Sequence, residues 1–229
     1  MESTQRRLVL VRHAQGSLGS ADYDRLSATG HEQGRRLAAR IRDVGRAHAV
    51  RGGLTRHRET AEHFDLGGEW RIDPGLNEYR VDRLLEVAFR HAGLLGLQPP
   101  PAAARQDPAA YLELFLRLFP RVLEAWQADR IECETNGRWA SFRARVDAAG
   151  MRLAASLERH PVVVAVTSAG VISTMTAGLL RHDLRWQRWL NVSLYNASIT
   201  ELVRLPTGTW DARRINCIDH LEDDLHTLA

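Results

Sequence analysis

The chain has 229 residues, of which 44% are hydrophobic and 26% are charged, a balance typical of a globular protein and not of a disordered one. The 31 basic residues, all arginine, and 28 acidic residues give a net charge of +3, and no basic run is long enough to indicate a nucleic-acid surface. No segment has the length and apolarity of a membrane span or a signal peptide, and the two cysteines, Cys133 and Cys217, form no disulfide or zinc pattern. These features predict a cytoplasmic protein without a nucleic-acid or membrane partner.

Strand-like and helix-like segments alternate through the first third of the chain. Residues 8–11, Leu-Val-Leu-Val, form the short apolar run of a buried parallel strand. Ser27 is a candidate N-cap for an amphipathic helix that carries Leu37, Ala38, Ile41 and Val44 on one face. Next we expect a strand, a helix and another strand at 48–53, 56–64 and 70–72.

Helical patterns dominate from about Tyr79 to Arg138. The stretch 111–128 is strongly amphipathic, and Pro120 within it is expected to kink the helix. We interpret residues 79–138 as a helical cap inserted into one domain of residues 1–229 and packed over one end of the sheet. The side chains of this cap are expected to select the substrate.

The last third returns to alternation. The clearest buried strand is 162–166, Val-Val-Val-Ala-Val. Around it we expect two helices and two late strands at 139–157, 171–180, 199–205 and 213–218. The acidic tail, 219–229, is expected to be exposed.

This order of elements predicts an α/β fold with a mostly parallel sheet and helices on both faces. Ligands of such sheets bind beyond the carboxyl ends of the strands. Two segments fall there: Arg12-His13-Ala14 after the first strand, and residues 167–170 after the strand at 162–166. Neutral imidazole is a competent nucleophile toward phosphorus near pH 7, and Arg12 beside His13 would neutralise phosphate oxygens.

Four motifs in this chain resemble those of the histidine phosphatase superfamily, also called the phosphoglycerate mutase-like family. That family's pattern is R-H-G, then L-[ST]-x-x-G-x-x-Q, then S-P-L-x-R-A-x-x-T-A, then an acid, then S-H-G-G. The matching segments here are R-H-A-Q, L-S-A-T-G-H-E-Q-G, L-T-R-H-R-E-T-A and V-T-S-A-G-V-I, at 12–15, 26–34, 54–61 and 166–172. The resemblance covers almost the whole chain and implies a three-layer α/β sandwich with no cofactor and no metal.

The resemblance also implies roles for individual residues. His13 resembles the residue that becomes phosphohistidine, and Glu78 resembles the general acid or base that protonates the leaving oxygen. The phosphate-binding positions are Arg12, Arg56, Ser168 and Ala169. Arg58 could reach the same pocket, but a solvated helix face is the preferred interpretation.

The chain departs from the family pattern at several positions. Ala14 replaces a glycine, Gly19 stands where many members have asparagine, and Gly52-Gly53 replaces Ser-Pro. Ser168 replaces the second histidine, which exchanges a charge-assisted hydrogen bond for a neutral one and forfeits roughly 1–2 kcal/mol. The substitution Ser168→His is therefore expected to strengthen oxyanion binding. His57 could partly substitute, although an ordinary position on a helix's first turn is the preferred interpretation.

The expected function is metal-independent hydrolysis of a small phosphorylated metabolite through a phosphohistidine intermediate. Three alternatives stay open: a phosphoglycerate mutase-like phosphotransferase, a catalytically silent member that binds a phosphorylated ligand or partner, and a serine hydrolase. The last would use Ser168, but Val166 occupies the first glycine position of G-x-S-x-G. A metal site at His220 and His226 is a weaker interpretation than a solvated tail, and a homo-oligomer is left open.

Overall fold

The structure is a computed structural model that describes residues 5–17, 24–98, 101 and 107–228. The chain forms two compact units, one of Met1–Glu78 with Val146–Ala229 and the other of Tyr79–Arg145. None of the helices among the described residues is long and apolar enough to cross a membrane.

The first unit is built on a six-stranded sheet in the order β3-β2-β4-β1-β5-β6. Strands β3, β2, β4 and β1 are parallel, and β5 and β6 are antiparallel to their neighbours. The α/β fold with a mostly parallel sheet is therefore confirmed. The strands are β1 (Arg6–Arg12), β2 (His48–Arg51), β3 (Arg71–Ile72), β4 (Val162–Thr167), β5 (Ile199–Arg204) and β6 (Trp210–Cys217).

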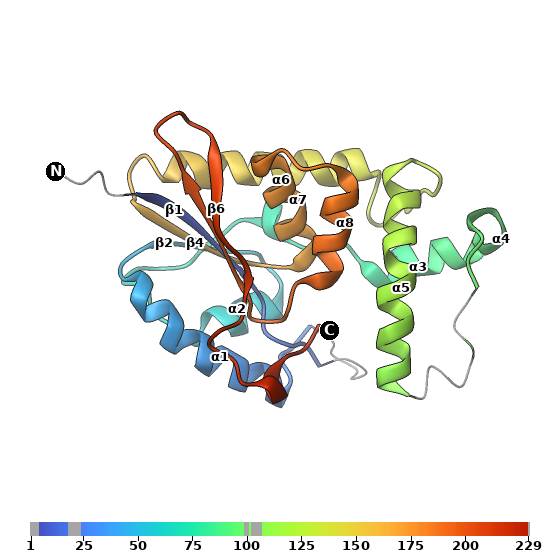
Figure 1. Cartoon of the computed structure of the whole chain (residues 1–229), viewed down its shortest axis with the longest axis horizontal. Helices are drawn as coiled ribbons and strands as arrows, with labels where there is room; N and C mark the ends of the chain where they lie inside the picture. The colour runs from blue at the N-terminus through green and yellow to red at the C-terminus, as the bar shows by residue number, and fades with distance from the viewer. Residues whose placement is uncertain (1–4, 18–23, 99–100, 102–106, 229) are drawn as a thin grey trace. The chain divides into compact units, whose positions relative to one another are not determined.

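The central strands are buried on both faces, as their continuous apolar runs predict. All six residues of β4 are buried, and the register aligns Arg12 at the end of β1 with Thr167 at the end of β4. Helices α1 (Ala28–Ile41) and α2 (Thr55–Ala61) cover one face, and α7 (Ala169–Leu180) covers the other (Figure 1). Beyond α7 the chain forms α8 (Leu184–Ser193). On the α1 side the core contains Val9, Val11, Leu37, Ile41, Ala61, Val164 and Val166.

The second unit is helical. It contains α3 (Val81–Arg90), α4 (Ala92–Leu95), α5 (Pro108–Gln127) and the first turns of α6 (Trp139–Ser156), which continues into the first unit. The assigned helix α5 is not interrupted at Pro120. The core of this second unit is an aromatic cluster of Tyr79, Phe119, Trp126, Trp139 and Phe142, in which contacting rings have centroids 5.1–6.3 Å apart.

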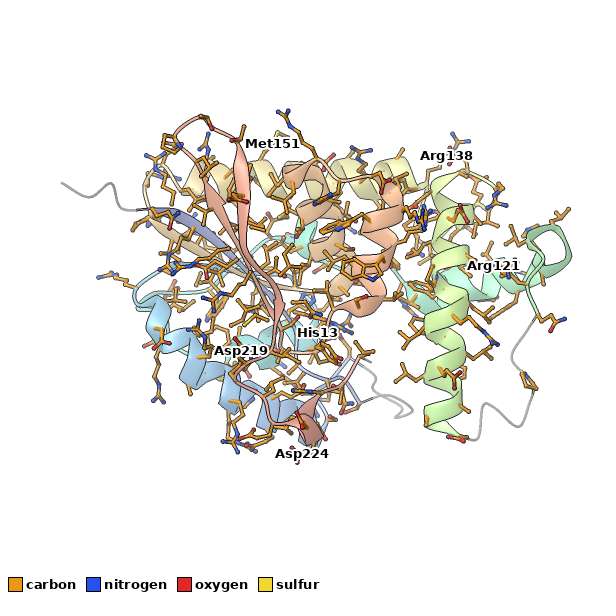
Figure 2. The ribbon with its side chains drawn as sticks, viewed as in Figure 1. His13, Arg121, Arg138, Met151, Asp219 and Asp224 are labelled. Carbon is orange, nitrogen blue, oxygen red and sulfur yellow. The ribbon has the colours of Figure 1, made fainter. Side chains whose placement is uncertain are left out.

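Two parts of the first unit differ from the sequence-based expectation. Helix α8 was not predicted, although Asp183 caps it by accepting a hydrogen bond from the backbone of Trp186. The tail was expected to be exposed, and this expectation is wrong: Leu221 and Leu225 are buried in the α1-side core. Leu225 ends a short 3-10 helix, Asp223–Leu225, and Leu221 precedes that helix. The neighbouring acidic residues, including Asp224, face solvent (Figure 2).

Candidate active site

The segments at the ends of four adjacent strands, β1, β2, β3 and β4, meet at the carboxyl edge of the parallel part of the sheet. His13 follows β1, and its backbone N–H donates to the carbonyl of Thr167 at 2.8 Å. Gly52 follows β2, and its N–H donates to the carbonyl of Val166 at 3.1 Å. The loop after β3 is fixed to the same edge, because the Thr167 hydroxyl donates to the Leu76 carbonyl at 2.6 Å. The predicted functional edge is thus where the side chains below converge, and Figure 2 labels His13 there.

The His13 ring is buried, and both of its nitrogens have partners. Nδ1 lies 2.7 Å from the carbonyl oxygen of Ala14, which can only accept a hydrogen bond, so the proton is assigned to Nδ1. Nε2 lies 3.1 Å from Nε of Arg56, which can only donate. The Nε2 lone pair is therefore unprotonated and points toward a guanidinium.

The surroundings of His13 also keep the ring neutral. Burial, followed by the positive charges of Arg56 and Arg12 and the nearby His57, holds its pKa well below the ordinary value of 6.5. At neutral pH the ring is therefore neutral, which is the form that a nucleophile requires.

The two predicted phosphate-binding arginines are both buried and both held in place. Arg12 donates to the backbone carbonyls of Leu194 and Leu228, the second at 2.9 Å. Arg56 pairs with Asp24 at 2.6 Å, and the other oxygen of that carboxylate accepts from the backbone N–H of Thr55 at the start of α2. Asp24, for which the sequence gives no signal, orients Arg56.

Glu78 follows the loop after β3, and its side chain contacts the first turn of α7. Its Oε2 accepts a hydrogen bond from the backbone N–H of Gly170 at 2.7 Å. Glu78 is half-buried, and the adjacent Asn77 accepts from the N–H of Gly53 at 2.6 Å. The structure thus places the candidate acid next to Ser168 and Ala169, which begin the same helix.

The motif from Leu26 to Gln33 supports the loop after His13. Ser27 caps α1 as predicted, accepting from the N–H of Gly30 at 3.0 Å and donating to the Gln15 side chain at 2.8 Å. The fully buried Gln33 accepts from the N–H of Gln15 and donates to the carbonyl of Leu225 at 2.7 Å. A Cβ at Gly30 would lie 2.1 Å from the Gln15 carbonyl oxygen, so the close approach requires glycine.

The structure places Ser168 against a second imidazole. The Ser168 Oγ lies 2.7 Å from Nε2 of His57, and both residues are almost completely buried, at 1% and 0% exposure. The rings of His57 and His13 have centroids 5.7 Å apart. His57 is therefore part of the site's buried interior, and the expectation of an ordinary position on the helix's first turn is incomplete.

Other candidate residues lie elsewhere or are engaged in structural contacts. Arg58 is exposed on α2 and lies 3.7 Å from Glu62. The N–H of Ala14 donates to the Thr60 hydroxyl at 3.0 Å, so the residue after His13 is anchored to α2. Within the described ranges no group of three or more His, Cys, Asp or Glu side chains could hold a metal, and the His220 Nε2 donates to the backbone carbonyl of Ala197 at 3.1 Å. Gly19 lies outside the described residues.

Comparisons with known proteins agree with the fold and the motifs. A family model described as the histidine phosphatase superfamily (branch 1) matches residues 8–92 and 113–218. The chain is similar in structure to a mycobacterial glucosyl-3-phosphoglycerate phosphatase, with 24% identity, a TM-score of 0.62, and 93% of this chain and 99% of that chain covered.

Two other solved structures are similar at lower identity. An alpha-ribazole phosphatase from Shigella flexneri has 20% identity and a TM-score of 0.61, over 92% of this chain and 96% of that one. A phosphoserine phosphatase from Entamoeba histolytica, in complex with 3-phosphoglyceric acid, has 17% identity and a TM-score of 0.62, over 95% of this chain and 100% of that one. The comparison with curated proteins finds no match.

Proposed function

The chain belongs to branch 1 of the histidine phosphatase superfamily, and we propose that it hydrolyses phosphomonoesters through a phosphohistidine formed at His13. The observation that carries the proposal is the hydrogen bonding of the His13 ring. Ala14 holds the proton on Nδ1, and Arg56 lies against the Nε2 lone pair. The ring is thus fixed in the tautomer that attacks through Nε2.

In the first half-reaction the Nε2 lone pair attacks phosphorus, and the bond between phosphorus and the ester oxygen breaks. The electron pair of that bond leaves with the oxygen, which takes a proton from the Glu78 carboxyl group. The products are the free alcohol and a phosphoryl group on Nε2, and the Ala14 carbonyl still accepts from Nδ1. Glu78 is held in a fixed position for this role, because its Oε2 accepts a hydrogen bond from the backbone N–H of Gly170.

In the second half-reaction a water molecule attacks the phosphoryl group and gives its proton to Glu78. The bond between phosphorus and nitrogen breaks, and its electron pair returns to Nε2. Inorganic phosphate leaves, and both His13 and protonated Glu78 are ready for another cycle. Glu78 thus acts first as acid and then as base, as the balance of protons requires.

Arg56 and Arg12 supply the positive charge that this chemistry needs. When a phosphoryl group reaches Nε2, the Arg56 guanidinium that faced the lone pair faces the phosphoryl oxygens instead. Arg12 adds a second charge, and both side chains are held by protein partners and so need little reorganisation. Because these groups provide the nucleophile, the acid and the charge, the proposed chemistry requires no metal.

A small phosphorylated metabolite is the proposed substrate class. The similar solved structures act, by their names, on phosphoserine, a glucosyl-phosphoglycerate and a ribazole phosphate, which share a phosphomonoester and differ in the alcohol. Hydrolysis is preferred over a mutase reaction because Gly19 replaces the asparagine that mutases usually keep. Both cysteines are free thiols, which supports the cytoplasmic location inferred from sequence.

The proposal is tested by phosphate release from a panel of phosphorylated metabolites and from p-nitrophenyl phosphate, with and without EDTA. His13→Ala is expected to lower turnover on the order of 10³-fold or more, because both half-reactions pass through the ring. Brief incubation with a ³²P-labelled substrate followed by rapid quenching should trap an acid-labile phosphoprotein in the parent and none in His13→Ala.

The matched control is His160→Ala, since His160 stacks on His48 at the opposite edge of the sheet, with centroids 4.7 Å apart. That variant should retain turnover and labelling. Turnover in His13→Ala within a few-fold of the parent, or activity that EDTA abolishes and a divalent cation restores, contradicts the proposal.

A further inference from the structure

Three departures from the family pattern meet at His57. His57 stands where the pattern has alanine, Ser168 where it has histidine, and Gly52 where it has serine. His57 Nε2 lies 2.7 Å from Ser168 Oγ, and a Cβ on Gly52 would lie 2.2 Å from His57 Nδ1. Any larger residue at position 52 would therefore overlap the imidazole. Relative to the family pattern, this chain therefore lacks an imidazole at the start of α7 and has one in the first turn of α2.

The Ser168 hydroxyl contacts His57 and makes no capping hydrogen bond within its own helix. Serine at an N-cap ordinarily accepts a hydrogen bond from an N–H of the first turn. Ser168 occupies the N-cap position of α7 with extended backbone angles, φ −121° and ψ 166°, but its side chain makes no cap hydrogen bond. Glu78 accepts from the Gly170 N–H instead. The serine is thereby left free to face His57.

The proton on His57 can be assigned from its surroundings. Among the described residues Nδ1 is buried without a hydrogen-bond partner. A buried N–H without an acceptor is rarer and more costly than an unused lone pair, so the proton belongs on Nε2. Burial, with the charges of Arg56 and Arg51, holds the pKa of His57 well below 6.5, so the ring is neutral at pH 7.

It follows that His57 Nε2–H donates to Ser168 Oγ, and the hydroxyl proton of Ser168 is available for another acceptor. His13 lies nearby, because Thr167, which precedes Ser168, accepts the His13 N–H and the two imidazole centroids are 5.7 Å apart. The opposite direction, with Ser168 donating to His57, would activate the serine as a nucleophile but would leave Nδ1–H buried without a partner.

We propose that His57 is a positioning residue that fixes the Ser168 hydroxyl as a donor to the phosphoryl oxygens, so that His57 and Ser168 together replace the family's second histidine. The inference rests on the proposed role of His13. Ser168 is the group that touches the phosphoryl group, and His57 acts through it. No bond is made or broken in this step, and the proton of His57 stays on Nε2.

The experiment is a double-mutant cycle on p-nitrophenyl phosphate turnover and orthovanadate inhibition. His57→Ala and Ser168→Ala are each expected to lower kcat and to weaken vanadate binding by about 5- to 30-fold, the effect of one lost hydrogen bond. Because His57 acts through Ser168, the double variant should be no worse than Ser168→Ala alone. Additive losses would overturn the proposal, as would an unchanged kcat and vanadate affinity in folded His57→Ala.

Two further variants separate positioning from packing. His57→Gln keeps an N–H donor of similar reach and should recover most of the kcat lost in His57→Ala. The exchange variant His57→Ala with Ser168→His restores the family's arrangement and should be at least as active as Ser168→Ala. If Gln gives no recovery although the variant has the parent's unfolding temperature, His57 does not act as a hydrogen-bond donor.

Two controls complete the design. His63→Gln removes another half-buried imidazole just beyond α2 and should leave kcat unchanged. His13→Ala reports the proposed function separately: if it retains turnover, the phosphohistidine mechanism fails whatever the His57 variants do. Covalent labelling of Ser168 by a fluorophosphonate probe would show that the serine is a nucleophile and would overturn the assigned direction of the hydrogen bond.

Discussion

Glu78 and Gly170 are joined by a hydrogen bond of 2.7 Å from the backbone N–H to the carboxylate. The bond fixes the candidate acid to the helix that Ser168 begins, although the two segments are far apart in the sequence. Glu78 thus has two contributions, a structural hydrogen bond and a proposed proton transfer. A glutamine at this position would separate them, because its amide oxygen can accept the same hydrogen bond but cannot deliver a proton.

Glu78→Gln therefore tests the acid role without loss of the structural contact. We expect the unfolding temperature to stay close to that of the parent, because the glutamine Oε1 can accept from Gly170. Turnover of an alkyl phosphate such as glycerol 2-phosphate should fall by about 10²–10⁴-fold, since an alkoxide leaves poorly without a proton.

The leaving group provides the control for this variant. The nitrophenolate of p-nitrophenyl phosphate departs without protonation, so the first half-reaction with this substrate should slow much less. Because Glu78 is also the proposed base of the second half-reaction, the two substrates are compared in a single turnover, by rapid mixing with enzyme in excess. Equal losses in the rate of alcohol release from the two substrates would mean that Glu78 is not the proton donor.

Gly30 is the second position where the structure makes a sharp prediction. A Cβ there would lie 2.1 Å from the Gln15 carbonyl oxygen, and backbone must move to admit it. Gly30→Ala is expected to reduce the free energy of unfolding by about 1–3 kcal/mol. Turnover should fall as well, because the displaced loop follows His13.

The matched control for this substitution is Gly68→Ala. No atom lies within 4 Å of a Cβ built there, and the residue is exposed. Urea unfolding of the two variants beside the parent should show a loss only for Gly30→Ala. A Gly30→Ala protein as stable and as active as the parent would refute the steric account of this motif.

Much of the fold follows from local pattern. The apolar runs at Leu8–Val11 and Val162–Val166 predicted β1 and β4, and Ser27 predicted the start of α1. These features are encoded by neighbouring residues, so sequence alone reveals them. The order of motifs was sufficient to predict the family, which the match over residues 8–92 and 113–218 confirms.

The features that sequence missed depend on contacts between distant segments. Asp24 pairs with Arg56, and His57 contacts Ser168 across 111 positions. Nothing in the sequence near Asp24 or His57 signals such a partner. The tail was misjudged for a related reason: its charges are typical of an exposed segment, while Leu221 and Leu225 are buried only because α1 and the sheet offer a surface for them.

The two buried histidines of the site should make stability depend on pH. The pKa of His13 and that of His57 are both well below 6.5 in the folded protein, mainly because burial disfavours the charged ring. As pH falls below about 6.5, the unfolded chain takes up protons that the folded chain does not. The free energy of unfolding is therefore highest above about pH 6.5. It decreases as the pH falls from there toward the folded-state pKa values.

Each such histidine contributes a slope of up to about 1.4 kcal/mol per pH unit in that window. Urea unfolding of the parent and of His57→Asn between pH 7.5 and 5.5 measures the contribution of one ring. His48, His63 and His220 also have lowered pKa values, but they are present in both proteins and cancel in the difference. Equal slopes for the two proteins would mean that His57 is protonated as readily in the folded state as in the unfolded one.

Ser168→His is the substitution for which the structure reverses the sequence-based expectation. By the family pattern alone, a histidine at position 168 should strengthen oxyanion binding. His57 Nε2, however, already lies 2.7 Å from the Ser168 Oγ, and both residues are almost completely buried. A second imidazole at position 168 would occupy the space of the first. We expect Ser168→His to reduce the free energy of unfolding by about 1–3 kcal/mol and to bind vanadate more weakly than the parent.

Removing the first ring should relieve this overlap. With His57→Ala in the same chain, the histidine at position 168 gains the volume that His57 vacates, so stability and vanadate binding should both recover relative to Ser168→His alone. Thermal unfolding and vanadate titration of the single and double variants measure this coupling. If Ser168→His alone is as stable as the parent and binds vanadate more tightly, the two side chains do not share one space. The proposal that His57 on α2 takes the place of the family's histidine at the start of α7 would then have no structural basis.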